Sequence, residues 1–260
     1  VESNGNANMI FVDGGNDRIH IGTATNVPVT GISPPFQISG TAYASASSGL
    51  NIFSNDAVPP YLVLGKSRGT SVGSFTVVAD NDACGSILAV AADGTDMDSN
   101  VGRIDFVIDG TPGGNDTPGR IVFNTTADGA TSVTERMRIQ SDGTVLVDQN
   151  SNATSLSLDS EATSAQVFRI DTPQSTTGHV IEVDAASSLT TGSILRLQSD
   201  SSSTSTRELV EIINDNSSAT GTTVLAIQQD AAAIGMKIDQ NGNENAINID
   251  AENTTKEALY

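Results

Sequence analysis

The second half of the chain repeats one short pattern, in which two apolar residues flank a single residue that is usually polar. Its nine copies are residues 145–147, 156–158, 168–170, 181–183, 195–197, 210–212, 225–227, 236–238 and 247–249, and their central residues lie 11 to 15 positions apart. Side chains two positions apart lie on the same side of an extended chain, so each copy predicts a short strand with one buried face. The apolar residues do not recur at helical spacing, which argues against helices.

The first part of the chain is also rich in expected strands, but without a regular repeat. Residues 9–12 and 18–21 flank Asp13-Gly14-Gly15-Asn16-Asp17, which is typical of a hairpin turn. A proline-bearing connector is expected at 27–35. Further strands are predicted at 61–64, 74–78, 86–90, 103–108, 120–123 and 136–140. The segments starting Gly102-Arg103-Ile104 and Gly119-Arg120-Ile121 echo each other 17 residues apart, which favours a mostly antiparallel β module.

These patterns predict an all-β, elongated protein with four parts. We expect an N-terminal β-hairpin and connector at 1–30, a β-rich module at 31–140, a repetitive β-helix-like or β-prism-like shaft at 141–255, and a short tail at 256–260. One strand per repeat encloses very little core, so a single copy gains too little burial to offset its loss of conformational entropy. Three copies that share one apolar axis solve this problem. A single-chain solenoid is the alternative, although coils of unequal length stack poorly.

Charge and composition exclude several functions. The chain carries 12 Lys and Arg against 31 Asp and Glu, a net charge of −19. This balance argues against nucleic acid and against anionic membrane surfaces, both of which attract basic residues. No apolar run approaches the ~20 residues that a membrane-spanning helix needs, so membrane insertion is not expected. A single Cys cannot form a disulfide framework within one chain. The chain begins at Val1 rather than Met, as expected of a processed or excerpted sequence.

Two stretches resemble a known family. Residues 119–147 open with Gly-Arg-Ile-Val-Phe-Asn-Thr-Thr and end with Thr-Glu-Arg-Met-Arg-Ile-Gln-Ser-Asp-Gly-Thr-Val-Leu-Val, and they resemble segments of tailed-phage tail fibres and related virion fibres. Residues 9–22 are similar to the same kind of module. The resemblance implies an elongated homotrimer on the surface of a virion. Its implied partners are its own copies, other virion components and a host surface receptor such as a polysaccharide.

The most conspicuous candidate chemistry is a column of acidic residues that follow the repeats. They are Asp148, Asp159, Asp171, Asp184, Asp239 and Asp250. Aligned carboxylates are suitable ligands for Ca²⁺. The alternative, which we favour, is that each Asp accepts hydrogen bonds from turn amides at the end of its strand. The fragments starting at Gly14 and Gly114 are similar to pieces of a Ca²⁺-binding nonapeptide, but they lie about 100 residues apart and predict tight turns.

No set of residues predicts catalysis. The chain has no Trp and three Tyr, so stacking platforms for sugars are scarce. His20 and His179 are isolated, and Cys84 has no sign of activation, so all three are expected to be structural. The four Asn-x-Ser/Thr sequons, at Asn124, Asn152, Asn216 and Asn253, are attributed to chance. We therefore assign no catalytic residue, cofactor or metal. The alternatives are a Ca²⁺-stabilised monomeric adhesin or cell-surface appendage and, less favoured, a polysaccharide-cleaving tailspike.

Overall fold

The computed structural model describes residues 9–149, 154–184, 191–205 and 208–249. The chain divides into two compact units, Val1–Phe168 and Arg169–Tyr260. The described residues contain eight strands and one short 3-10 helix, η1 (Tyr43–Ser45), so the predicted all-β class is confirmed. In this part of the chain no helix is long and apolar enough to cross a membrane. The predicted tail at 256–260 lies outside the described residues.

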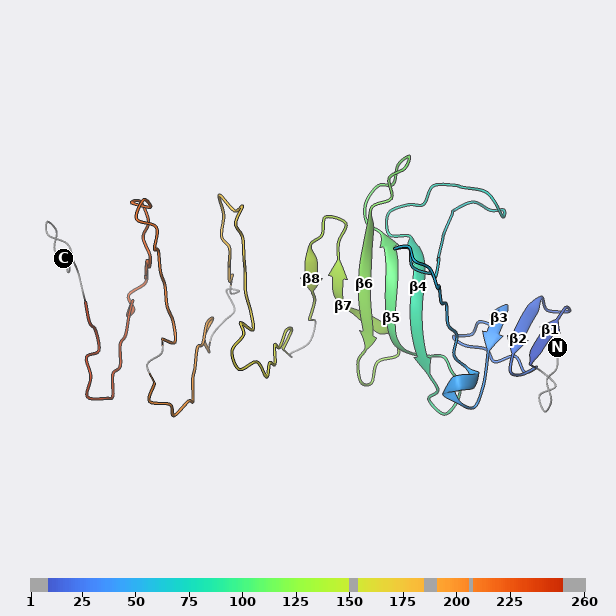
Figure 1. Ribbon diagram of the computed structural model, residues 1–260, viewed down its shortest axis with the longest axis horizontal. Coiled ribbons are helices and arrows are strands. Elements are labelled where there is room, and N and C mark those ends of the chain that lie inside the picture. Colours follow the sequence, from blue (N-terminus) through green and yellow to red (C-terminus); the bar gives the residue numbers. More distant parts are fainter. Residues whose placement is uncertain (1–8, 150–153, 185–190, 206–207, 250–260) are drawn as a thin grey trace. The chain divides into compact units, whose positions relative to one another are not determined.

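A three-stranded sheet lies near the start of the first unit (Figure 1). Its strands are β1 (Ile10–Asp13), β2 (Arg18–Ile21) and β3 (Phe36–Ile38), with β1 antiparallel and β3 parallel to β2. The predicted hairpin is confirmed. Asp13 shapes its turn by accepting hydrogen bonds from the Gly15 amide at 3.2 Å and the Asn16 side chain at 2.8 Å. Strand β3 was not predicted, because three residues that follow two prolines carry almost no alternating pattern.

A five-stranded antiparallel sheet forms the rest of the ordered β structure in this unit. Its strands are β4 (Ala83–Ala91), β5 (Ser99–Ile108), β6 (Gly119–Thr126), β7 (Val133–Ile139) and β8 (Val145–Val147). They lie side by side in the order in which they occur along the chain, as Figure 1 shows. The predicted strands from 86–90 to 136–140 are therefore confirmed. The first repeat, 145–147, is the edge strand β8 of this sheet.

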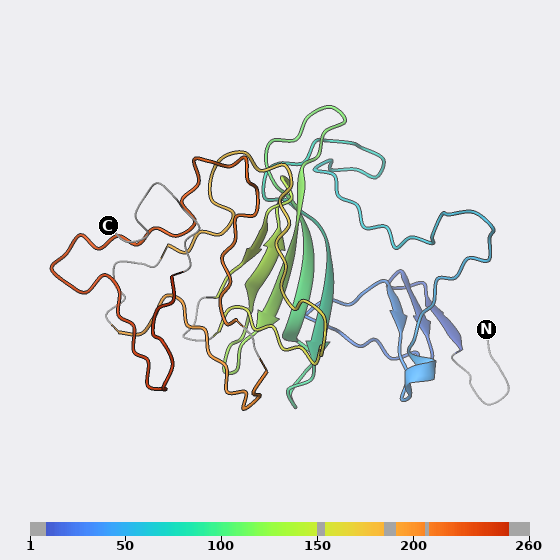
Figure 2. The ribbon, with the colours of Figure 1, turned by 60° about the vertical axis from the view of Figure 1, so that its left-hand side comes forward.

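Two other predicted strands are absent. The long connection from η1 to β4 is drawn without a strand in Figure 2, although it contains 61–64 and 74–78. Residues 74–78 share two backbone hydrogen bonds with the segment before them, from the Arg68 amide to the Thr76 carbonyl at 3.2 Å and from the Ser74 amide to the Ser71 carbonyl at 3.1 Å. A strand requires a ladder of such bonds with a neighbour, and the single chain provides none here.

The eight later repeats likewise carry no strand in the described residues. Their backbone is extended, as the alternating pattern requires, but no neighbouring segment of the same copy pairs with it. The prediction of strands is therefore wrong for one copy on its own. A solenoid that buries the apolar pairs within one chain is also not formed over these residues, and the shaft predicted at 141–255 stays a prediction that involves further copies.

The apolar core of the single chain is very small. Among the described residues, Ile108 and Val122 are the apolar side chains that are buried, with exposed fractions of 4% and 7%. Both belong to the five-stranded sheet. A chain that leaves nearly all of its large apolar side chains accessible lacks the main driving force for stable folding.

Candidate assembly interface

One face of the five-stranded sheet is apolar from edge to edge. Residues that lie directly opposite one another on neighbouring strands form two rows across it. The first row is Ile87, Ile104, Phe123, Met137 and Val147, and the second is Gly85, Phe106, Ile121, Ile139 and Val145. Neither row contains a charged or hydrogen-bonding side chain. Cross-strand apolar pairs of this kind stabilise a sheet when water is excluded from them.

This face is only partly covered by its own chain. Ile87, Phe106, Val145 and Val147 are exposed. Leu64, from the connection between η1 and β4, lies over Gly85 so closely that a Cβ at that position would stand 2.6 Å from the Leu64 Cβ. The residues beside this contact leave a groove of about 380 Å³. It is lined by Leu62, Val63, Leu64, Gly85, Ile87 and Phe106.

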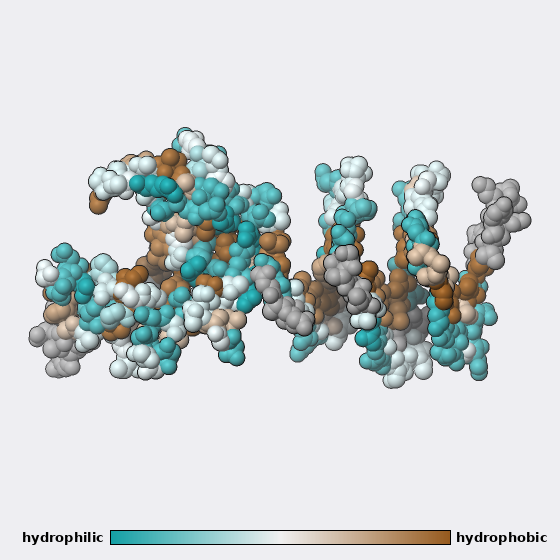
Figure 3. Space-filling view, turned by 180° about the vertical axis from the view of Figure 1, so that it is seen from behind, coloured by the Kyte–Doolittle hydropathy of each residue, from teal (hydrophilic) through white to brown (hydrophobic). Residues whose placement is uncertain are grey.

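The repeats expose their apolar pairs in the same way. In the copy at 195–197, Leu195 is 74% exposed and Leu197 is 55% exposed, and the described apolar pairs of the other repeats after β8 are also exposed. Figure 3 shows apolar surface midway along the extended segments of this region, whereas polar residues gather toward the turns. Each repeat thus presents a short apolar stripe that its own copy leaves open to solvent.

The three-stranded sheet has the same two-sided character. On one face His20, 1% exposed, lies between its strand neighbours Phe11 and Gln37, with the His20 and Phe11 ring centroids 6.1 Å apart. The other face is aliphatic and aromatic. It carries Ile10, Val12, Ile19, Ile21, Phe36 and Ile38. Val12, Ile19 and Phe36 on that face are exposed.

The opposite face of the five-stranded sheet is mostly polar, although it also carries the exposed Leu88 and Leu146. The Asp105 carboxylate, in a residue only 6% exposed, accepts hydrogen bonds from Ser86 Oγ at 2.5 Å, Arg103 Nε at 2.7 Å and Asn124 Nδ2 at 3.0 Å. Three donors around one carboxylate compensate for its removal from water. The Asp105 carboxylate therefore finds its partners within its own chain.

Next to this cluster, Glu135 and Arg138 form an ion pair on β7. Arg138 Nη2 donates to Glu135 Oε2 at 2.8 Å, and its Nε donates to the other carboxylate oxygen. Glu135 raises the pKa of the Arg138 guanidinium. The two-pronged contact fixes both side chains against the strand and adds to the polar character of this face.

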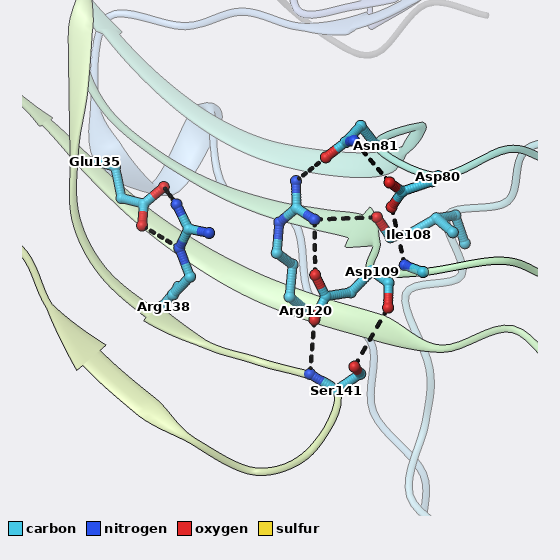
Figure 4. Close-up of polar contacts among 9 residues, drawn as sticks. Asp80, Asn81, Ile108, Asp109, Arg120, Glu135, Arg138 and Ser141 are labelled. Carbon is cyan, nitrogen blue, oxygen red and sulfur yellow. Dashed lines mark hydrogen bonds and ion pairs between the residues drawn. The ribbon is translucent and has the colours of Figure 1, made fainter.

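A second hydrogen-bond network joins the connecting segments at one end of the five-stranded sheet (Figure 4). Arg120 Nη1 donates to Asp109 Oδ1 at 2.9 Å and to the Ile108 carbonyl at 3.2 Å, while Nη2 donates to Asn81 Oδ1 at 2.7 Å. Asp109 Oδ2 also accepts the Ser141 amide at 2.9 Å. The Ser141 amide and then Arg120 hold the pKa of Asp109 below its usual value. The network holds the segments before β4, after β5 and after β7 in place.

The predicted acidic column shows no metal site. Across the described ranges, no group of three or more His, Cys, Asp or Glu residues is placed to hold a metal ion. The favoured prediction of turn-amide acceptors is also not what the structure shows at two repeats. There Asp171 accepts from Arg169 Nη2 at 2.7 Å, and Asp239 Oδ2 lies 3.6 Å from Lys237 Nζ. Asp250 lies outside the described residues.

The remaining candidate residues are dispersed. His179 is exposed, with Nδ1 3.7 Å from Glu182 Oε2, and Cys84 is a half-buried free thiol in β4. Both fragments similar to the nonapeptide form turns, the second closed by a bridge between Gly113 and Asp116. Of the sequons, Asn124 is engaged with Asp105 on the sheet and Asn216 is exposed. Asn152, Asn253 and Tyr260 lie outside the described residues.

Comparisons with known proteins give partial structural likenesses. No protein-family model and no curated protein matches the chain. The chain is similar to the carboxy-terminal domain of the bacteriophage T5 L-shaped tail fibre, with 16% identity over 42% of this chain and 41% of that chain, at a TM-score of 0.33. It is also similar to that domain with its intramolecular chaperone domain, with 17% identity over 56% of this chain and 37% of that chain, at a TM-score of 0.28. The chain thus spans about two fifths of the length of either solved chain.

Proposed function

We propose that the chain is a non-enzymatic structural protein of a virus particle, a homotrimeric fibre that mediates attachment to a host cell surface. The observation that carries the proposal is the distribution of apolar side chains. One face of each sheet and the paired positions of the repeats are apolar and accessible in one copy. On the polar face of the five-stranded sheet, in contrast, the Asp105 carboxylate finds its hydrogen-bond donors within the same copy.

Burial between copies accounts for this distribution. A sheet that is apolar on one face is stable only when that face is covered by another layer. Three copies around one axis can supply that layer to one another at every level, from the sheet to the last repeat. Each repeat then contributes one strand and two inward side chains per copy, and three copies close a small triangular core. Closed rotational symmetry leaves no apolar stripe exposed along the axis.

The assignment to a virus particle has a separate support, the resemblance of residues 9–22 and 119–147 to tail-fibre segments. The second stretch runs from β6 to β8, which contribute three of the five strands of the larger sheet. Attachment by such a fibre needs no deep pocket. Several weak contacts made together reach high avidity through effective concentration. The net charge of −19 per copy keeps neighbouring fibres apart in solution.

The decisive experiment is the mass of the purified chain in solution, measured by mass photometry and by sedimentation. We expect a species of three times the 26.7 kDa of one chain, unchanged by EDTA. A monomer would refute the trimer, and a complex that dissociates in EDTA would favour the Ca²⁺-stabilised adhesin. Labelled trimer is then tested for adsorption to candidate host cells. Release of oligosaccharides from purified capsule would instead establish a depolymerase.

A further inference from the structure

The connection between η1 and β4 contains an unusual apolar segment, residues 50–63. It carries seven large apolar side chains that are exposed and one charged residue, Asp56. The seven are Leu50, Ile52, Phe53, Val58, Tyr61, Leu62 and Val63. Phe53 is the extreme case, with 99% of its surface accessible. An apolar run of this size at the surface of one copy marks a contact with another molecule.

The backbone of this segment is unpaired as well. Among the described residues, no backbone-to-backbone hydrogen bond involves residues 47–66. Residues 50–63 have only local side-chain acceptors, Ser54 Oγ for the Asp56 amide at 3.2 Å and Asp56 Oδ1 for the Val58 amide at 3.1 Å. Extended backbone with free amides and carbonyls, next to apolar side chains, has the properties of a strand that lacks its neighbour.

The same chain has an open sheet edge of matching character. Strand β4 pairs with β5 on one side, and in the described part of the chain no strand pairs with its other side. Its nine residues, Ala-Cys-Gly-Ser-Ile-Leu-Ala-Val-Ala, include no charged residue and no proline. Natural proteins protect edge strands with charges, prolines or covering segments, because an uncovered edge adds further strands. The register of β4 is irregular at Ala83/Gly85 and at Ala89/Val90, and the uncharged stretch between these irregularities, residues 85–89, is regular and open to a further strand.

The position of Leu64 determines where the segment leaves its own sheet. Leu64 is in contact with Gly85 near the start of β4, and the groove beside that contact is bounded by Ile87 and Phe106. Residues before Leu64 lead away from this anchor. Copies that each carry a net charge of −19 repel one another, so uncharged surfaces are the places where two copies can meet closely. Residues 50–63 and the edge of β4 are both such surfaces.

We propose that residues 50–61 form an exchanged arm that covers the sheet of a second copy. Leu62 and Val63 stay beside Ile87 and Phe106 of their own copy. Residues 50–61 add their backbone to the open edge of β4 in the neighbouring copy and cover the part of its groove that is left open. Each copy gives one arm and receives one, so three copies close a ring in which every β4 edge is paired. The proposal rests on the trimeric fibre proposed above and adds the contact that links its copies at the level of the β module.

Hydrogen exchange followed by mass spectrometry tests the arm on the full-length assembly. Amides of residues 50–61 and of the β4 edge should exchange at least about 100-fold more slowly in the trimer than in a Leu197→Asp monomer. Unprotected arm amides in an intact trimer would overturn the arm while leaving the trimeric fibre in place. A protein that is monomeric at micromolar concentration would overturn both, so the two failures are distinguishable.

A photo-crosslinking amino acid at position 52 separates exchange from a fold-back within one copy. Irradiation of the trimer should give covalent dimers on a denaturing gel, with the crosslink mapped to the β4 region. Crosslinks confined to one copy would refute the exchange.

The substitution Ile52→Asp should lower the melting temperature of the trimer by several degrees, whereas Asn51→Asp, the same carboxylate one residue away, should change it little. Equal effects of the two variants would contradict the burial of the Ile52 side chain in the trimer.

Discussion

Replacing Leu197 by Asp places a charge at one apolar position of one repeat, and it tests the trimeric shaft directly. In one copy the side chain is 55% exposed and makes no hydrogen bond, so the substitution should leave an isolated copy almost unchanged. In the proposed trimer the same position occurs three times in one layer of the core. The effect of the substitution should therefore appear in assembly rather than in the fold of the copy.

The expected size follows from burial. Complete burial of a Leu side chain contributes about 1.5–3 kcal/mol of stability. Roughly half of the Leu197 surface is still accessible in one copy, so trimer formation would gain about 1 kcal/mol per copy from its burial, or about 3–4 kcal/mol per trimer. The substitution removes this gain. Each buried carboxylate costs several kcal/mol more, and three lie together. A total above about 10 kcal/mol per trimer weakens association by roughly seven orders of magnitude. Trimers of the variant should be absent at micromolar concentration.

Mass photometry and analytical ultracentrifugation of the variant measure this loss. The matched control is Gln198→Asp, which adds the same carboxylate one residue later, at the place where Asp171 and Asp239 follow their own repeats. The control should assemble normally. A Leu197→Asp protein that still forms trimers with an unchanged melting temperature would show that this side chain does not face a shared core.

Three further predictions concern the surface, acid and metals. Glu182→Ser, at the polar centre of a repeat, should shift the melting temperature of the trimer by no more than about 1 °C, whereas a large loss would mean that the two faces are reversed. Arg68 lowers the pKa of Asp82, and mainly the Ser141 amide lowers the pKa of Asp109. Both carboxyl groups therefore have a lower pKa in the folded than in the unfolded chain. The stability that they contribute to the fold is complete above about pH 4 and is lost as the pH falls further. Melting curves from pH 7 to pH 3 should show this decline, and Asp109→Asn should flatten it. EDTA should leave the melting temperature unchanged, and a collapse on chelation would indicate a structural cation instead.

The sequence predicted the strands whose partners lie next to them along the chain. Residues 103–108 place Arg103 and Asp105 between apolar neighbours, and the antiparallel partner at 120–123 follows directly after one connection, 109–118. The apolar run at 61–64 also predicts a strand, yet a sequence pattern shows only which side chains share a face. It does not show where the neighbouring backbone comes from, and for this segment and the later repeats no described segment of the same copy forms a strand beside them.

The site was predictable in part. The echo between the segments at Arg103 and Arg120 corresponds to two arginines on the polar face of neighbouring strands. The partners of Arg120 could not be predicted, because Asn81 reaches Arg120, and Ser141 reaches Asp109 beside it, only through the topology of the sheet. The pairing of Asp171 with Arg169 did have a signal that was missed. Residues two apart lie on the same side of an extended chain, so a cation at the centre of a repeat lies beside the Asp that follows it.

Among the described residues, the buried apolar side chains are Ile108 and Val122, and this has a consequence for assembly. In the proposed trimer, a newly synthesised copy gains little by folding before it meets other copies, so the rate of assembly should depend on a high power of the protein concentration. Yield should then rise steeply with expression level, and elevated temperature should reduce the formation of new trimers far more than it damages finished ones. A finished trimer should come apart only when many layers separate together, which would give it high kinetic stability.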